Sequence, residues 1–354
     1  MGHALSIEVA SNILGVCKQT LRRWDETGKL KAARSESGYR LYYLNDLQKH
    51  IPEDKAKPFL KWAGGKSQLL PYILPHVPDD YEEYLEPFVG GGALFFTLQP
   101  KKAKLNDINP ELINTYKQIR DNVDEVISLL DAHQKKHSEE YYYKIRSMNV
   151  GRMKEVSRAA RFIYLNKTCF NGLHRVNQKG QFNVPVGSYK KPKILDDTNL
   201  RACSKSLENT ELFSMDYREF LKAHSTPNCF IYLDPPYIPV SQYSDFDRYA
   251  EGKFRIGSQL DLSYLYSELV ESGANALLSN SSSELSYRLY SEFKVETVQA
   301  SRFINKDGSK RGKVDEILVH PKRVQEPSFP STRYMGSKTS LLPYISGWLF
   351  LYQK

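Results

Sequence analysis

The apolar stretch 228–233, of sequence NCFIYL, restricts the fold most, because it runs directly into Asp234, Pro235, Pro236 and Tyr237. A short apolar run of this kind is typical of a strand that is buried on both faces. Proline fixes φ and lacks an N–H donor, so a central strand cannot continue through two successive prolines. The carboxylate of Asp234 is therefore expected where a buried strand leaves its sheet.

Strand-like and helix-like segments alternate between residues 59 and 320. The segments YEEYLEPF, KAKLNDI, NCFIYLD and NALLSN resemble strands, whereas 109–136 and 260–273 have the apolar spacing of helices. This alternation predicts an α/β sheet with crossover helices. The stretch from about residue 111 to 200 does not follow the alternating pattern expected of the sheet, and we interpret it as an inserted subdomain.

The first 52 residues predict a separate small module, followed by the polar linker IPEDKAKP at 51–58. Two short helices, ending at Gly15 and Gly28, flank a tight turn, and a hairpin wing follows. The stretches TLRRWDETGKL and GYRLY resemble the winged helix-turn-helix of the MerR and excisionase families. This resemblance implies that the second helix faces DNA, through Gln19, Thr20, Arg22 and Arg23, with help from Arg40. A small helical domain without DNA binding is the alternative.

Positive charge is concentrated in one segment. The formal net charge is +9, and residues 151–193 carry ten Lys or Arg residues against a single acid, Glu155. Aromatic rings are interleaved with this charge, a mixture suited to phosphate and base contacts, so a polyanion is the expected partner. A solvated basic face is the alternative interpretation.

Composition also excludes several classes of protein. No apolar run is long enough for a transmembrane helix, so no membrane partner is expected. The four cysteines show neither metal-ligand spacing nor a disulfide framework, which favours reduced thiols and a cytoplasmic location.

A glycine-rich turn, EPFVGGGALFF at 86–96, follows an expected strand and enters an expected helix. It lacks the dinucleotide fingerprint G-x-G-x-x-G but fits F-x-G-x-G through Phe88, Gly90 and Gly92. Asp107, after the next strand, can accept hydrogen bonds from ribose hydroxyls. Together they predict a nucleoside site. The stretch KWAGGKS at 61–67 does not have P-loop spacing, so a nucleoside triphosphate is not expected.

The Asp-Pro-Pro-Tyr turn predicts a pocket whose polar groups are hydrogen-bond acceptors and which therefore binds a ligand with donor groups. The prolines contribute carbonyl groups without N–H groups, so the Asp234 carboxylate and the Pro235 carbonyl act only as acceptors. Such a pair matches an exocyclic amino group, and Tyr237 can stack on a planar base. A simple proline turn is the alternative.

Part of the chain is repeated. KWAGGKSQLLPYI (61–73) and RYMGSKTSLLPYI (333–345) are identical at seven of thirteen positions. We interpret residues 325–354 as the truncated start of a second domain that resembles the one beginning near residue 59; a chance amphipathic match is the alternative.

These motifs in this order resemble the Dam-type, class alpha or D12 class, DNA adenine-N6 methyltransferases. FLKWAGGK, EPFVGGGALFF, NDINPELI, the segment 165–192, YLDPPYIPV and RGKVDEILV carry the resemblance, from residue 59 to about 320. It implies a methyltransferase domain at 53–324 with a Rossmann-like sheet and a DNA-recognition insert. It also implies S-adenosylmethionine as methyl donor and a flipped-out adenine, in GATC, as target.

The resemblance assigns roles by position. The catalytic residues would be Asp234, Pro235, Pro236 and Tyr237. The cofactor would contact Trp62, Ala63, Lys66, Phe88, Gly90, Asp107, Asp216 and Asp234. DNA would contact Lys61, Phe170, Asn171, Leu173, Arg175 and Tyr189, with Arg22 and Arg23 in the N-terminal module. No metal is expected in the reaction. Ser188 departs from the family, whose members usually carry arginine there, so strict GATC recognition is in question.

Other activities stay open at this point. Cytosine-N4 methylation more often places Ser at position 234, and RNA or protein glutamine methylation more often places Asn. An inactive methylase fold acting as a DNA-binding regulator is a further alternative. The resemblance implies double-stranded DNA as the partner, with a cognate restriction endonuclease as a candidate second partner, and bacterial cytosol or a phage-infected cell as the location. The enzyme is expected to act as a monomer. For the N-terminal module the hypothesis is a tether to DNA or a repressor of its own promoter.

Overall fold

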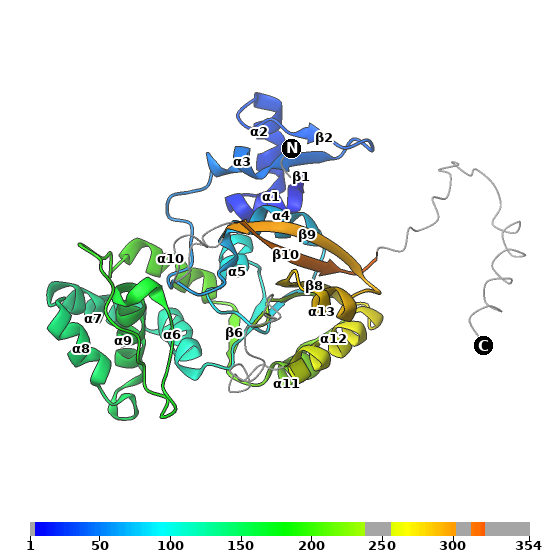
Figure 1. Cartoon of the computed structure of the whole chain (residues 1–354). Helices are drawn as coiled ribbons and strands as arrows, with labels where there is room; N and C mark the ends of the chain where they lie inside the picture. The colour runs from blue at the N-terminus through cyan, green and yellow to red at the C-terminus, as the bar shows by residue number, and fades with distance from the viewer. Residues whose placement is uncertain (1–3, 238–255, 302–312, 323–354) are drawn as a thin grey trace, which may run out of the picture. The chain divides into compact units, whose positions relative to one another are not determined.

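A seven-stranded sheet forms the centre of the computed structural model, which describes residues 4–237, 256–301 and 313–322 (Figure 1). Its strands follow the order β6-β5-β4-β7-β8-β10-β9. Their bounds are β4 (Glu83–Glu86), β5 (Ala103–Asn106), β6 (Thr210–Phe213), β7 (Cys229–Leu233), β8 (Asn275–Ser281), β9 (Lys294–Ser301) and β10 (Lys313–His320).

The direction of the strands confirms the predicted Rossmann-like α/β architecture. β6, β5, β4, β7 and β8 are parallel, whereas β10 runs antiparallel to both β8 and β9. From β4 the chain moves outward through β5 to β6, and it then returns to place β7 on the other side of β4. Ligands of open α/β sheets bind at the carboxyl ends of the strands flanking such a reversal.

Helices occupy the connections between the strands. Their bounds are α4 (Leu70–Ile73), α5 (Ala93–Leu98), α6 (Pro110–Asp121), α7 (Val123–Lys135), α8 (Glu139–Ser147), α9 (Glu155–Thr168), α10 (Asp197–Leu207), α11 (Tyr217–His224), α12 (Ile256–Glu271) and α13 (Glu284–Leu289). Four 3₁₀ turns are η1 (Lys66–Gln68), η2 (Leu74–His76), η3 (Val150–Arg152) and η4 (Phe170–Gly172). The long connection from β5 to β6 holds α6 to α10 and contributes no strand to the sheet.

The N-terminal module has the predicted helix-turn-helix and wing. Its elements are β1 (Ala4–Ser6), α1 (Ile7–Leu14), α2 (Lys18–Thr27), β2 (Ala33–Arg34), β3 (Arg40–Tyr43) and α3 (Leu44–Gln48), and its small sheet has the order β1-β3-β2. Gly15 and Gly28 end the two helices at φ of 64° and 79°, a left-handed conformation that glycine adopts without strain. The two glycine positions predicted from the sequence are therefore the helix ends.

Contacts join this module to the larger sheet. Lys55 donates from Nζ to the carbonyl oxygens of Asn12 and Ile13 at the end of α1 and of Thr97 in the last turn of α5, over 2.8, 2.5 and 2.8 Å. The carbonyl ends of both helices carry partial negative charge, so one ammonium group holds them together. The module boundary near residue 52 and the insert boundaries stay predictions from the sequence.

Two expectations concern the rest of the chain. The copied motif at 333–345, and with it the proposed domain 325–354, lies outside the described residues. Within the described ranges, none of the helices combines the length and the hydropathy that a bilayer-spanning segment needs.

Candidate active site

The carboxyl ends of β4 and β7 lie side by side at the reversal of strand order. Leu85 of β4 pairs with Ile231 of β7, so Glu86 and the residues after Leu233 emerge together from the sheet. β7 is buried along its whole length, as its apolar sequence predicted. Asp234 therefore stands at the crevice in which this class of sheet binds ligands.

Asp234 is held between two side chains from other segments. Its Oδ1 atom lies 2.8 Å from Nζ of Lys66 and accepts a 3.0 Å hydrogen bond from the Ser279 hydroxyl. Burial raises the pKa of Asp234, and the Lys66 ammonium acts in the opposite direction. Lys66, predicted as a cofactor contact, is thus the direct charge partner of this carboxylate.

The two residues after Pro235 have fixed partners. The Pro236 carbonyl accepts a 2.7 Å hydrogen bond from Nε2 of Gln259 in α12, and the Tyr237 hydroxyl donates to Glu316 of β10 over 2.6 Å. Lys66 Nζ also lies 4.6 Å from the centre of the Tyr237 ring. With the Pro236 carbonyl engaged by Gln259, the Pro235 carbonyl is the stronger candidate for a ligand's amino group.

The glycine turn forms a narrow cradle beside this group. Gly90 adopts a φ of 46°, and its N–H donates to the Asp107 carboxylate over 3.2 Å. A Cβ atom at Gly90 would lie only 2.7 Å from the Trp62 ring, so a side chain at this position would collide with it. Asn109 donates a second backbone N–H to Asp107, over 2.9 Å. The structure thus brings together Trp62, Gly90 and Asp107, as predicted.

The other predicted cofactor residues occupy less defined positions. Phe88 packs against Tyr217, with ring centres 5.1 Å apart, and Ala63 is exposed in the loop before η1. Asp216 begins α11 and is already paired with the Arg218 guanidinium over 2.8 and 2.9 Å. Both oxygens of Asp216 accept hydrogen bonds from Arg218, so a ligand amino group could bind only to their remaining lone pairs.

Sequence reasoning missed several residues of the site. Glu86 is buried and accepts a 2.8 Å hydrogen bond from the Tyr84 hydroxyl. Burial, against the opposing effect of that hydrogen bond, raises the pKa of Glu86 to about 8. Ser279 and Gln259 were also missed. The sequence could have indicated two of them by position: Glu86 is the last residue of β4, and Ser279 lies near the end of β8. Ligands of this class of sheet bind at such strand ends.

Five of the predicted DNA-contacting residues lie between residues 170 and 189 of the insert, and Lys61 reaches them from the loop before η1. Lys61 Nζ lies 4.2 Å from the centre of the Tyr189 ring, and a Cβ at Gly172 would meet the Lys61 side chain. Phe170 is 45% exposed, a large fraction for an aromatic ring, and Asn171 adopts a left-handed φ of 54°.

The remaining two residues of that set lie just beyond. Leu173 is partly buried, and Arg175 binds Asn183 within the hairpin over 2.7 Å. The chain thus presents one exposed ring beside several polar groups.

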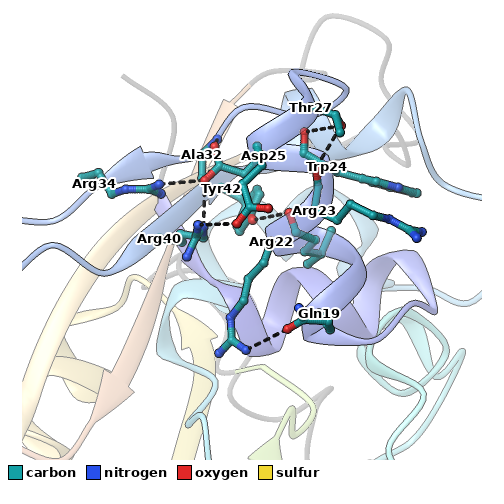
Figure 2. Close-up of polar contacts among 12 residues, drawn as sticks. Gln19, Arg22, Arg23, Trp24, Asp25, Thr27, Ala32, Arg34, Arg40 and Tyr42 are labelled. Atoms are coloured by element: carbon teal, nitrogen blue, oxygen red, sulfur yellow. Dashed lines mark hydrogen bonds and ion pairs between the residues drawn. The ribbon is translucent and has the colours of Figure 1, made fainter.

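In the N-terminal module, α2 presents its basic residues to solvent (Figure 2). Arg22 and Arg23 are exposed, and Arg22 donates to Gln19 over 3.3 Å. Arg40 instead donates to the buried carboxylate of Asp25 over 2.8 Å. That bond joins the wing to α2 and leaves Arg40 less available for DNA than its position in the sequence suggested.

A Rossmann-like sheet with a glycine turn after β4, an acid after β5 and Asp-Pro-Pro-Tyr after β7 is the arrangement of an amino-group methyltransferase. The chain matches the model of the D12 class N6 adenine-specific DNA methyltransferase family over residues 62–304, and it belongs to this family. Residues 6–42 match the MerR family regulatory protein model.

Relatives agree with this assignment. The type II methyltransferase M1.LlaDCHI of Lactococcus lactis subsp. cremoris is 44% identical over 78% of this chain and 98% of its own length. The type II methyltransferase M.MjaIII of Methanocaldococcus jannaschii is 42% identical over 75% of this chain and 99% of its own. The DNA adenine methylase of Vibrio cholerae is 36% identical over 75% and 96%. The chain is therefore an adenine-specific DNA methyltransferase, and the alternatives of cytosine, RNA or protein methylation are set aside.

Proposed function

We propose that this enzyme transfers a methyl group from S-adenosylmethionine to N6 of a flipped-out adenine in duplex DNA, with GATC as its recognition sequence. The observation that carries the proposal is the position of Asp234, at the end of β7, between Lys66 and Ser279. When bound, S-adenosylmethionine supplies an electrophilic methyl group that the N6 nitrogen attacks in line.

The cradle around Gly90 fits this cofactor. Trp62 closes one side, and only a residue without a side chain fits against its ring. Each oxygen of Asp107 accepts one backbone N–H, whereas a carboxylate has about four acceptor positions. Asp107 can therefore still accept hydrogen bonds from the two ribose hydroxyls.

The Asp-Pro-Pro-Tyr turn would bind the target base. The Asp234 carboxylate and the Pro235 carbonyl accept the two N6 protons, which directs the nitrogen lone pair away from the ring plane. Tyr237, held by Glu316, offers a face on which the adenine stacks. Asp234 acts as a polarising acceptor, and the proton leaves after transfer. Positioning supplies most of the rate enhancement.

The insert would open the duplex. Removing a base from the stack costs a few kcal/mol, and the exposed ring of Phe170 can fill the gap and offset part of that cost. Asn171, Leu173 and Arg175 would contact base edges, while Lys61, against the Tyr189 ring, would contact the first base pair.

The biological role is proposed from the relatives. Two of them are named type II methyltransferases, a term of restriction-modification systems, and others are named DNA adenine methylases. These names support the proposal of a restriction-modification role with a paired endonuclease, or of an epigenetic mark.

The N-terminal module would bind a second DNA segment through Arg22 and Arg23. Deleting residues 1–52 is a poor test, because Lys55 ties α1 to α5 and the deletion would remove two of its three acceptors. Arg22→Ala with Arg23→Ala is the better variant. We expect it to lose operator binding and to keep methylation of short duplexes; unchanged operator binding would reject the role.

Methylome sequencing in a host without adenine methylation tests the whole proposal. We expect N6-methyladenine at GATC. Adenine methylation at another sequence would overturn the GATC assignment alone, and the absence of methylated adenine would overturn the proposed activity.

A further inference from the structure

Two histidines and a glutamate from three distant segments meet on the edge hairpin of the sheet. They are His76 at the end of η2, Glu296 in β9 and His320 at the end of β10. His320 pairs with Lys294 and Glu296 pairs with Leu318, so Glu296 and His320 share one face of the hairpin. His76 approaches that face from the loop that follows α4.

The group lies away from the methyltransferase site. Leu233 at the end of β7 pairs with Leu278 of β8, and Leu318 of β10 pairs with both Ser279 and Glu296, so Asp234 and Glu296 lie at about the same level along the strands. The strands β8 and β10 stand between them, which at about 4.8 Å per strand separates the two backbones by roughly 14 Å. Methyl transfer makes no use of these residues.

The Glu296 carboxylate faces both imidazole rings and turns one oxygen toward each. Oε2 lies 3.2 Å from Nε2 of His76, and Oε1 lies 3.2 Å from Nε2 of His320. The three ligand atoms all lie within 4.8 Å of one another. Ligands about 2.0–2.1 Å from a tetrahedral zinc ion lie roughly 3.3 Å apart. Each imidazole nitrogen already lies at this spacing from one oxygen of Glu296, although the two oxygens differ, and a small rotation of the carboxylate and the rings brings one oxygen and both nitrogens within reach of a single ion.

His320 lies between two hydrogen-bond acceptors. Its Nδ1 atom is 3.2 Å from the Pro321 carbonyl oxygen, and its Nε2 atom faces Glu296 at the same distance. A neutral imidazole carries one N–H, so it satisfies one acceptor and turns a lone pair toward the other. If Nδ1–H donates to the carbonyl, the Nε2 lone pair faces a carboxylate. A cation between them removes this repulsion, and a backbone carbonyl on the second nitrogen is the usual support of a metal-binding histidine.

His76 is suited to the same role. Its Nε2 atom points at Oε2 of Glu296, so an ion beside that oxygen would also meet an imidazole nitrogen. The two rings lie 4.4 Å apart between centres, which places both imidazoles on one side of the carboxylate.

We propose that His76, Glu296 and His320 bind one zinc ion, with water as the fourth ligand. Two imidazoles and one carboxylate are a ligand set typical of zinc, whereas magnesium and calcium prefer oxygen ligands alone. The ion would hold η2 against the edge hairpin. Since η2 also packs against β1, it would brace the part of the sheet nearest the N-terminal module. The proposed role is to brace this edge of the sheet, with water in the position that a structural zinc site more often fills with a fourth protein ligand.

Lys294 is the competitor for the same carboxylate. Its Nζ atom lies 2.9 Å from Oε1 of Glu296, so an ion-pair cluster without metal is the alternative occupant. The Lys294 side chain is 59% exposed and can move into solvent when a metal ion binds. If the site binds metal, Lys294→Ala removes a competing cation and keeps or increases zinc affinity. If the residues form only an ion-pair cluster, Lys294→Ala shows no saturable zinc binding.

The test uses the full chain, purified without a polyhistidine tag, stripped with chelator and titrated with zinc chloride against a chromophoric chelator. We expect one zinc ion per chain and, with cobalt, the visible absorption bands of a tetrahedral site. Glu296→Gln and His76→Ala are each expected to weaken binding by about tenfold or more. His50→Ala, which removes a histidine whose ring centre lies 5.7 Å from that of Trp24, is the matched control and should leave affinity unchanged.

Glu296→Gln is nearly isosteric, so it carries the test if His76→Ala does not fold. The absence of saturable binding, or binding that Glu296→Gln leaves intact, would overturn the proposal and leave an ion-pair cluster only.

Discussion

Lys66 Nζ lies 2.8 Å from Asp234 Oδ1, so the acid proposed to grip the target amino group is paired with an ammonium before any ligand arrives. The pair explains how a carboxylate survives in an ionised form at the buried end of β7. Burial raises the pKa of Asp234, and Lys66 limits the rise. Lys66 would thus have two roles: it keeps Asp234 ionised, and it contacts the cofactor.

Replacing Lys66 should shift the pH dependence of catalysis. Without the ammonium, burial acts on Asp234 unopposed, its pKa rises, and the ionised acceptor is lost at a higher pH. For Lys66→Met we expect the acidic limb of kcat, at saturating methyl donor, to move to higher pH, while Lys66→Arg keeps it near its original position. Lys104→Met, which removes a lysine paired with Glu83, is the control. An unmoved limb in Lys66→Met would refute this electrostatic role.

Glu86 should make stability fall as the pH rises. The pKa of Glu86 in the folded state is about 8, mainly because of burial, against about 4.3 for an unperturbed glutamate. Between these values the folded state keeps a proton that the unfolded state has released, so the free energy of unfolding decreases with rising pH. Glu86→Gln should flatten this slope in urea unfolding measured across the window. Glu83→Gln is the control, and an unaltered slope in Glu86→Gln would contradict the assignment.

Phe170 should matter for base flipping more than for DNA affinity. Aromatic stacking on a base is worth about 1–3 kcal/mol, so Phe170→Ala should lower kcat/KM by roughly tenfold or more. With 2-aminopurine in place of the target adenine, the fluorescence gain on binding should shrink. Val176→Ala, which trims another exposed apolar side chain of the insert, should change neither. If Phe170→Ala flips the base normally, the Phe170 ring does not fill the gap in the base stack as proposed.

Asp25 should be required for the stability of the N-terminal module. Its buried carboxylate accepts from the Ala32 N–H over 3.0 Å, from Arg34 over 2.7 Å and from Arg40 (Figure 2). Asp25→Ala leaves these donors without their acceptor and should lower the free energy of unfolding by roughly 1–3 kcal/mol. Trp24 fluorescence during urea unfolding measures the loss, and Asp46→Ala on the exposed face of α3 should cost far less.

Acid should have the same effect as that substitution. The Ala32 N–H first, and then Arg34, hold the pKa of Asp25 well below its ordinary value. The stabilisation is therefore present above the unfolded pKa of about 3.9, and it is lost as the pH falls below it. The stability difference between wild type and Asp25→Ala should therefore shrink as the pH falls, and a difference that stays constant into acid would exclude this contribution.

Local rules predicted the strand ends and helix ends well. The apolar run before Asp234 and the glycines after α1 and α2 have physical reasons that act within a few residues. The order of the motifs also located Gly90 beside Asp107, because both follow neighbouring parallel strands. These parts of the site needed no knowledge of distant contacts.

The missing parts depend on pairing between distant segments. Ser279 contacts Asp234 only because β8 lies next to β7, and Gln259 contacts Pro236 from a helix that packs over that edge. The sequence predicts Arg40 as a DNA contact, but in the structure its side chain is paired with Asp25. The segment 109–136 was read as continuous helical spacing, but Asn122 divides it into α6 and α7.

Mass spectrometry of nucleosides tests the central claim most directly. Duplex DNA is incubated with S-adenosylmethionine and the wild-type protein, Asp234→Ala, or Asp261→Ala as a surface control, and is then digested completely. We predict N6-methyladenine with the wild type and with Asp261→Ala, and none with Asp234→Ala even though that variant still binds the duplex. Near-normal N6-methyladenine from Asp234→Ala, or methylcytosine from the wild type, would contradict the account.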